Sequence, residues 1–358
     1  MLSTVIFFIG LAVVIATFFS ALSTFVLPRA ARSELNRLVF GILRRIIEIP
    51  LRFTNDFRRR DSIMAYYAPI GFLLLVPTWY ALVSLGYTAM YWALGYGSWF
   101  ESFRLSGSSL LTLGFETSNG LLINILIFSE AILGLILVAL LIAYLPTMYA
   151  AFSRREKSVN LLAVRAGDPP SAIEMILRFH RIHGLEGLND YWKEWEIWFA
   201  DIEETHTVLP ALVFFRSPKP EHSWVIAAGT VLDAASITLS SLEIPYNATA
   251  ALCIRAGFLA LRSIIDYFDI PYPMDPHFPE TTISISKSEF DAALERLAEA
   301  GVPVKNDREK AWLDYAGWRV NYDRTFIALC SLTMAPKAMW SGERPATSKM
   351  PPLMVSKK

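Results

Sequence analysis

Three long stretches almost free of charge constrain this chain more than any other feature of its sequence. Residues 1–28 and 62–100 contain no charged side chain, and residues 121–153 contain only Glu130. An α-helix needs about 20 apolar residues to cross the hydrocarbon core of a bilayer. Each stretch is long enough for this, so the sequence predicts a mainly α, integral membrane protein with three transmembrane helices.

The charged residues are divided unevenly along the chain. All 358 residues together carry 33 basic and 33 acidic side chains, a net charge of zero. The first 153 residues hold 10 arginines, no lysine and 7 acidic residues, and the rest of the chain holds 23 basic and 26 acidic ones. This balance argues against a nucleic-acid partner. The only cysteines, Cys253 and Cys330, are too few for a disulfide framework.

The arginines predict the orientation in the membrane. Nine of them lie between residues 28 and 61, and Arg154 and Arg155 follow the third stretch. Basic loops stay on the cytoplasmic side, so we expect a multi-pass protein of the plasma (cell inner) membrane, with the N-terminus outside and the C-terminal domain cytoplasmic. A cleaved signal peptide is the alternative for residues 1–28, although its basic residues would precede the apolar core rather than follow it.

The basic linker that follows the first stretch has a helical pattern. Apolar residues recur every three or four positions from Leu35 to Ile47, with Ser33 as a possible N-cap and Pro50 as a possible stop. Such a helix either lies in the membrane interface or packs on the cytoplasmic domain of the protein.

Between the second and third stretches, residues 94–120 are too apolar for a simple loop. A helix here would end at Gly114, and its roughly 12 residues would be too few to span the membrane. A short helix followed by extended chain at Gly114 fits a re-entrant loop. Irregular backbone at membrane depth is tolerated only where protein buries it or where it lines a water-filled path. The segment therefore predicts a pore.

This arrangement resembles the pore of the potassium-channel family. That family has two spans flanking a pore helix and a filter of the form Thr-[Val/Ile/Leu]-Gly-[Tyr/Phe]-Gly. The resemblance covers about a quarter of the chain, residues 64–157. The matching filter positions are Thr112, Leu113, Gly114, Phe115 and Glu116.

The resemblance implies how such a filter works. Backbone carbonyls of residues 112–115 and the Thr112 hydroxyl would replace the hydration shell of a potassium ion. Gly114 would supply backbone angles that other residues adopt at a cost. Phe115 would point away from the ions. One chain carries one loop, so the family implies a homotetramer, with potassium ions as the only bound group and no other cofactor or metal.

Glu116 departs from the family because a second glycine is usual there. A left-handed backbone at a non-glycine residue costs about 1–2 kcal/mol, so the outermost ion site would be reshaped. Four Glu116 carboxylates would instead form an anionic ring that attracts cations. Potassium selectivity, a less selective cation pore and a pore-like fold that does not conduct all stay open.

Further residues of the pore half have two interpretations each. Glu130 either braces the pore helix, through Arg104 or the hydroxyls of Ser106, Ser108 and Ser109, or is solvated at the outer interface. Gly134 is a candidate gating hinge or a site of close helix packing. Pro146 either kinks the third span at a gate or stands at an ordinary helix end.

The C-terminal half has the composition of an ordinary soluble domain. We predict helices over residues 172–180, 208–216, 224–239, 249–268 and 288–299, with a short strand over 282–286. The helices over 208–216 and 224–239 are expected to be buried, with further membrane contact as the alternative. Trp192, Trp195 and Phe199 form a core stripe. A dinucleotide-binding Gly-x-Gly-x-x-Gly is lacking. A metal site built from His180, His183, Glu203, Glu204 and His206 has weak support, because these residues are scattered.

The sequence thus predicts a cation-selective channel, preferring potassium, with passive conduction and gating by the cytoplasmic domain. A membrane-anchored assembly or sensor protein is the alternative. An enzyme is not expected, because no nucleophile with a matched base is present. The expected order is a transmembrane helix (1–28), a basic linker (29–61), a pore domain (62–153), a helical cytoplasmic domain (154–334) and a flexible tail (335–358).

Overall fold

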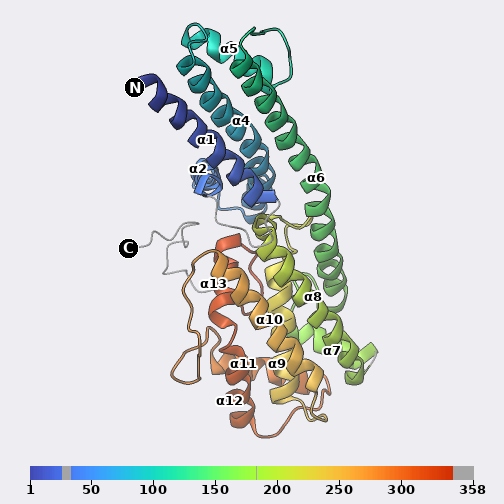
Figure 1. The fold of residues 1–358 in the computed structure, drawn as a ribbon. Coiled ribbons are helices and arrows are strands. Elements are labelled where there is room, and N and C mark those ends of the chain that lie inside the picture. The colour runs from blue at the N-terminus through green and yellow to red at the C-terminus, as the bar shows by residue number, and fades with distance from the viewer. Residues whose placement is uncertain (26–33, 183, 342–358) are drawn as a thin grey trace. The chain divides into compact units, whose positions relative to one another are not determined.

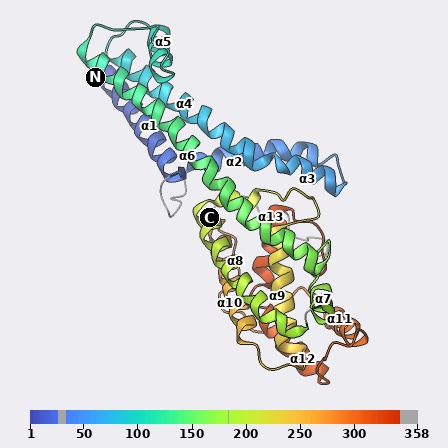
Figure 2. The same ribbon diagram turned by 90° about the vertical axis from the view of Figure 1, so that its right-hand side faces the viewer.

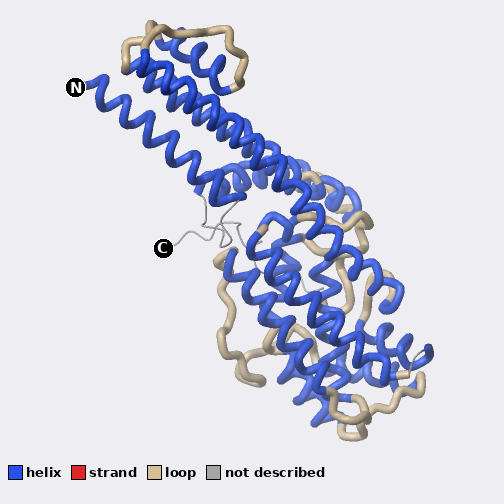
Figure 3. The backbone as a smooth tube through the Cα atoms, turned by 45° about the vertical axis from the view of Figure 1, so that its right-hand side comes forward, coloured by secondary structure: helices blue, strands red, loops and turns tan. Residues whose placement is uncertain are grey.

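The computed structural model describes residues 1–25, 34–182 and 184–341, which are mainly helical (Figures 1 and 3). Within these residues the chain forms no β-strand, and the one isolated bridge pairs Leu242 with Val304. The chain divides into two compact units, which we describe separately. Unit 1 comprises residues 1–50 and 66–150, and unit 2 comprises residues 51–65 and 151–358. Ser33 and the end of the tail lie outside the described residues.

Unit 1 is built from α1 (Leu2–Phe25), α2 (Glu34–Leu51), α4 (Tyr67–Ala93), α5 (Trp99–Leu110) and the first part of α6 (Leu121–Ala166). Helix α1 lies along α4 through glycines: a Cβ on Gly10 would meet the carbonyl oxygen of Gly86 at 2.5 Å. Small residues let helix backbones approach in this way when lipid surrounds them. Helix α1 is therefore packed on α4 as an integral part of unit 1.

Helix α2 confirms the amphipathic pattern but not its predicted end. It continues through Pro50 to Leu51, so Pro50 does not stop it. Proline at this position removes only the hydrogen bond to the carbonyl of residue 46, in the last turn of the helix. The Phe40 ring packs on Tyr67 and Phe72 of α4, each with ring centroids 5.8 Å apart. On the opposite side several apolar residues are exposed: Leu38, Ile42, Ile46 and Ile49.

Helix α6 is one continuous helix of 46 residues (Figure 2). At 1.5 Å per residue it is roughly 69 Å long, about twice the thickness of a bilayer core. It therefore extends beyond the predicted end of the third span at residue 153 and into unit 2. Pro146 lies inside it, so the interpretation of Pro146 as an ordinary helix end is wrong.

Five helical segments of the described residues are long and apolar enough to cross a membrane, namely 2–24, 57–93, 121–166, 224–241 and 248–267. They differ in how much of their apolar window the protein itself covers: 22% in α1 and 17% in α6, but 94% in α9 (Trp224–Ser241). The apolar surface of α9 is already buried, so this helix belongs to the core of unit 2. The outward face of α10 (Ala248–Tyr267) mixes Leu252 and Leu259 with Arg255 and Asp266.

Unit 2 surrounds α9 with the other helices of the C-terminal half. Helix α8 packs on α10, and Trp192, Trp195 and Phe199 are buried as predicted. The other helices are α3 (Phe57–Ala65), α7 (Ala172–Ile182), α8 (Leu188–Val208), α11 (Lys287–Glu299), α12 (Arg308–Arg319) and α13 (Asp323–Thr333), with short 3-10 turns at Leu185–Gly187 and Pro210–Phe214.

Two predictions for unit 2 are wrong, and in both cases a distant side chain binds the backbone. Residues 208–216 are not one helix, because α8 ends at Val208 and the carbonyls of Leu212 and Phe215 accept hydrogen bonds from Arg155. Residues 282–286 form no strand, because the Asp323 carboxylate accepts the amide hydrogen of Ser284 at 2.9 Å. Sequence periodicity does not register such long-range partners.

A buried ion network holds unit 2 together. The Arg319 guanidinium pairs with Asp233 of α9 and with Asp323 of α13, the latter at 2.8 Å. The hydroxyl of Tyr322 also donates to Asp233, at 2.8 Å. These side chains are almost fully buried. A buried charge is tolerated only when it is paired and hydrogen-bonded in this way.

Candidate functional site

The candidate site is the end of α5 together with residues 112–116. Helix α5 starts with a capping box in which Ser98 and Glu101 bind each other's backbone amide groups. This motif fixes the first turn of a helix whose 12 residues, roughly 18 Å, are too short to span a bilayer. The chain then leaves the helix at Leu111 and continues as the 112–116 loop.

Two residues of the loop have left-handed backbone angles. Gly114 has φ of 72°, the conformation expected of it, and Thr112 has φ of 54°. Glu116 is not among the residues with positive φ, so the strain expected there falls on Thr112 instead. Such a conformation costs a β-branched residue on the order of 1–3 kcal/mol. The Thr112 hydroxyl donates to the carbonyl of Leu111 at 2.8 Å.

Ser108 holds the loop against α5. Its carbonyl oxygen accepts the amide hydrogens of Leu113 at 2.8 Å and Gly114 at 3.3 Å. Its hydroxyl accepts the amide hydrogen of Glu116 at 3.0 Å. One buried serine thus fixes the backbone of three of the five loop residues.

Arg104 binds the same end of the loop. Its guanidinium lies 2.6 Å from the Glu116 carboxylate and 5.8 Å from the centroid of the Phe115 ring. The Arg104 side chain is 48% exposed and that of Glu116 is 25% exposed. An ion pair at such exposure contributes about 0–1 kcal/mol to stability. The ion pair therefore adds little to stability, and its main effect is to hold the Glu116 carboxylate close to Arg104.

Glu130 of α6 is fully buried behind α5. Its carboxylate accepts hydrogen bonds from the hydroxyls of Ser106 at 2.5 Å and Tyr91 at 2.8 Å. Ser106 in turn lies 2.9 Å from the hydroxyl of Ser84. Glu130 therefore contacts α5 and α4 and is not solvated, although Arg104 and Ser108 bind the loop rather than Glu130.

Gly134 is the point where α6 contacts the end of α5. A Cβ at this position would lie 2.3 Å from the carbonyl oxygen of Leu110, closer than real atoms approach. The Tyr80 hydroxyl donates to the carbonyl of Gly134 at 2.7 Å. Close packing thus requires glycine here. A hinge at Gly134, and a gate at Pro146, stay predictions.

The polar residues of α4 were missed by sequence reasoning. Tyr80, Ser84, Tyr87 and Tyr91 recur at spacings of four, three and four, which places them on one helical face. This face contacts Gly134, Ser106, Ser129 and Glu130. This spacing could have predicted a polar face on α4, although not that the face contacts α5 and α6.

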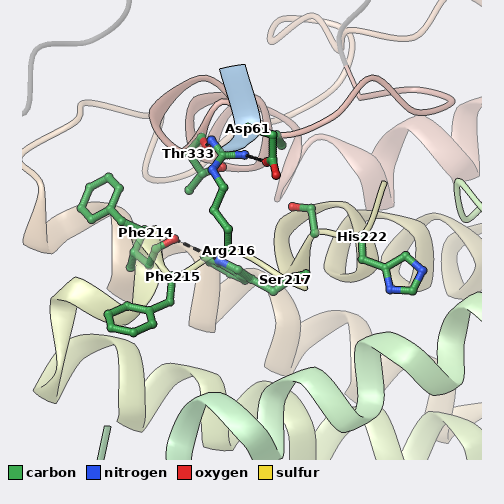
Figure 4. Close-up of a pocket in the computed structure, with 11 residues that line it drawn as sticks. Asp61, Phe214, Phe215, Arg216, Ser217, His222 and Thr333 are labelled. Atoms are coloured by element: carbon green, nitrogen blue, oxygen red, sulfur yellow. Dashed lines mark hydrogen bonds and ion pairs between the residues drawn. The ribbon is translucent and has the colours of Figure 1, made fainter. Parts of the chain in front are cut away.

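A second cluster lies in unit 2, around residues 212–216. Arg155 of α6 is buried and donates to the carbonyls of Leu212 and Phe215, both at 2.7 Å. Arg216 pairs with Asp61 of α3 and donates to the carbonyl of Thr333 at the end of α13 (Figure 4). A helix end leaves such carbonyls without intrahelical donors. Residues 212–216 thus connect α6, α3 and α13.

Arg216 also lines a small pocket beside His222 and Ser217 (Figure 4). Among the described residues no group of three or more His, Cys, Asp or Glu side chains could hold a metal ion. His183, one of the scattered candidates, lies outside the described residues. His206 is buried against Arg155 rather than being open to a ligand.

Comparison with known proteins adds no family to these observations. No protein-family model, curated protein or solved structure matches the chain.

Proposed function

We propose that this protein is a cation-selective ion channel that prefers potassium and conducts passively. The observation that carries the proposal is the 112–116 loop, a glycine-containing turn at the end of a short helix inside a unit with membrane-spanning helices. Ser108 and Arg104 hold the loop to α5. The C-terminal end of α5 directs its carbonyls toward the loop, which favours cations.

The pore requires several copies of the chain. One chain supplies one loop, and a symmetric ring is the simplest way to enclose a path with identical loops. Leu113 and Phe115 are 61% and 56% exposed in the single chain, which leaves apolar surface for neighbouring copies. We propose a homotetramer in the plasma membrane, spanned by α1, α4 and α6, with the basic segments in the cytoplasm.

Flux through reconstituted vesicles tests this function. Wild-type protein should carry a potassium flux, and Gly114→Asp should abolish it, because a charged side chain then stands in the loop. Gly184→Asp is a matched control: Gly184 has φ of 73° and, as at Gly114, an added Cβ would meet no atom within 4 Å. This control should keep the wild-type flux. Equal flux in the wild type and Gly114→Asp, or no flux in the wild type, would contradict the channel.

We propose further that unit 2 gates the pore through α3 and α6. Helix α3 ends at Ala65, next to the start of α4 at Tyr67, and α6 continues from unit 1 to Arg155. Both helices are bound by residues 212–216, through Arg216 and Arg155. A rearrangement of this segment would therefore pull on both membrane helices that flank the loop.

Single-channel recording of Arg216→Gln tests the gating step. The variant should change the open probability several-fold and leave the potassium-to-sodium permeability ratio unchanged. Arg59→Gln is the control, because Arg59 lies on α3 like Asp61, the partner of Arg216, but its side chain is 80% exposed. A folded Arg216→Gln protein with wild-type open probability would contradict gating through this contact.

A further inference from the structure

Helix α5 contacts both the backbone and the side chain of Glu116, the last residue of the loop. Arg104 and Ser108 are four residues apart on α5, so their side chains lie on one face, one turn apart. Ser108 binds the amide of Glu116, and Arg104 binds its carboxylate. Backbone and side chain of Glu116 are therefore both drawn toward α5.

This geometry changes what Glu116 does at the mouth of the pore. A free ring of carboxylates would concentrate cations of every kind at the entrance. A carboxylate this close to a guanidinium nitrogen, 2.6 Å away, has its charge largely neutralised. The side chain of Glu116 is already three-quarters covered within a single chain. The ionic character of the entrance thus depends on Arg104.

We propose that Arg104 is a specificity-determining residue, which holds the Glu116 carboxylate against α5 and so keeps it out of the ion path. Ions leaving the filter then meet backbone carbonyls rather than a ring of negative charge. Without Arg104 the carboxylate is released, and the entrance becomes an anionic, less selective site. This inference rests on the proposed channel function.

Reversal potentials of the reconstituted full-length protein, measured between potassium and sodium, test the inference. Arg104→Gln should conduct with a permeability ratio at least several-fold closer to one, and block by external calcium should strengthen. Arg104→Lys, which keeps the positive charge, should remain near the wild type. Glu116→Gln should also remain selective, because it leaves no carboxylate at the entrance.

The double variant Arg104→Gln/Glu116→Gln separates a charge effect from a loss of mechanical support. With the carboxylate gone, the double variant should recover most of the wild-type permeability ratio and lose the added calcium block. A double variant as unselective as Arg104→Gln would overturn the inference, as would a selective Arg104→Gln.

The outcomes also separate this inference from the channel itself. A wild-type protein without current overturns the proposed function and the inference with it. A conducting wild type whose Arg104→Gln variant keeps its selectivity overturns the inference alone. Gel filtration in detergent confirms that each variant has folded and assembled like the wild type.

Discussion

Glu130 in unit 1 and Arg319 in unit 2 are both fully buried ionisable side chains, but the two units satisfy them differently. Glu130 accepts hydrogen bonds from the hydroxyls of Ser106 and Tyr91. Arg319 pairs with the carboxylates of Asp233 and Asp323. Unit 1 surrounds its buried carboxyl group with hydroxyl groups next to the 112–116 loop, and unit 2 uses opposite charges to hold a core together.

The apolar helices of the two units also differ in how much of their surface is exposed. Most of the apolar window of α6 is exposed, whereas that of α9 is covered by neighbouring helices. Large exposed apolar surfaces are rare on soluble proteins and indicate contact with lipid or protein. The candidate spans of unit 1 thus leave apolar surface uncovered, as contact with lipid would require, and the polar groups of unit 1 gather around the loop.

The largest effect is expected from breaking the ion network of unit 2. Arg319→Ala leaves Asp233 and Asp323 buried without their cation, which should lower the free energy of unfolding by about 3–5 kcal/mol. Arg324→Ala, at an exposed position, should change it by less than about 0.5 kcal/mol. Denaturant titration followed by tryptophan fluorescence measures both. Equal effects would contradict a network that stabilises the core.

A smaller loss is expected at Glu130, because its partners are neutral. Glu130→Ala removes the acceptor of the Tyr91 hydroxyl and leaves the Ser106 hydroxyl with Ser84 alone, a cost of about 1–3 kcal/mol. Glu130→Gln keeps an amide oxygen and should cost less. Unfolding in mixed detergent micelles compares the two variants. A Glu130→Gln variant less stable than Glu130→Ala would contradict hydrogen-bond acceptance as the requirement of this site.

One substitution should have opposite signs in the two units. Gly134→Ala places a methyl group against the Leu110 carbonyl, and such overpacking costs about 1–3 kcal/mol. Gly317→Ala in α12 has no atom within 4 Å of the added group and should stabilise that helix by about 0.5–1 kcal/mol. Thermal unfolding of the two variants checks the signs. A stabilising Gly134→Ala would remove the evidence for tight packing at the end of α5.

Acid should destabilise unit 2 through His206. Burial, followed by the charge of Arg155, holds the pKa of His206 well below its usual value of 6.5. Its Nε2 faces an N–H donor of Arg155 at 3.1 Å and its Nδ1 faces the Thr205 hydroxyl at 3.0 Å. Protonation of His206 would place an N–H donor on Nε2 directly against the N–H donor of Arg155.

The sign of the pH effect follows from this shift. Below pH 6.5, His206 binds a proton in the unfolded chain but not in the folded chain. The free energy of unfolding therefore falls by up to about 1.4 kcal/mol per pH unit as the pH drops toward the folded pKa. Above pH 6.5 the contribution is fully present. His206→Gln should flatten the slope between pH 6.5 and 5, and the exposed control His277→Gln should not. Identical slopes in all three proteins would contradict a buried neutral His206.

The sequence predicted the helical class and the helices α7 to α11 of unit 2, because charge and helical periodicity are local properties. It did not predict α3, α12 or α13. It did not predict the Arg104–Glu116 pair, because that contact depends on the loop folding back onto α5. It also failed at residues 208–216 and 282–286, where Arg155 and Asp323 bind the backbone from far along the chain. The polar face of α4 could have been predicted from the spacing of its residues, but the residues that this face contacts could not.

The central claim is that loops from several chains enclose one shared path. Wild-type and Gly114→Asp chains, mixed in equal amounts before assembly and reconstituted together, test it directly. If four loops form the path and one defective loop blocks it, the potassium flux should fall to about one-sixteenth of that of wild type alone. A flux of about one-half would show that each chain acts independently and would contradict the shared pore.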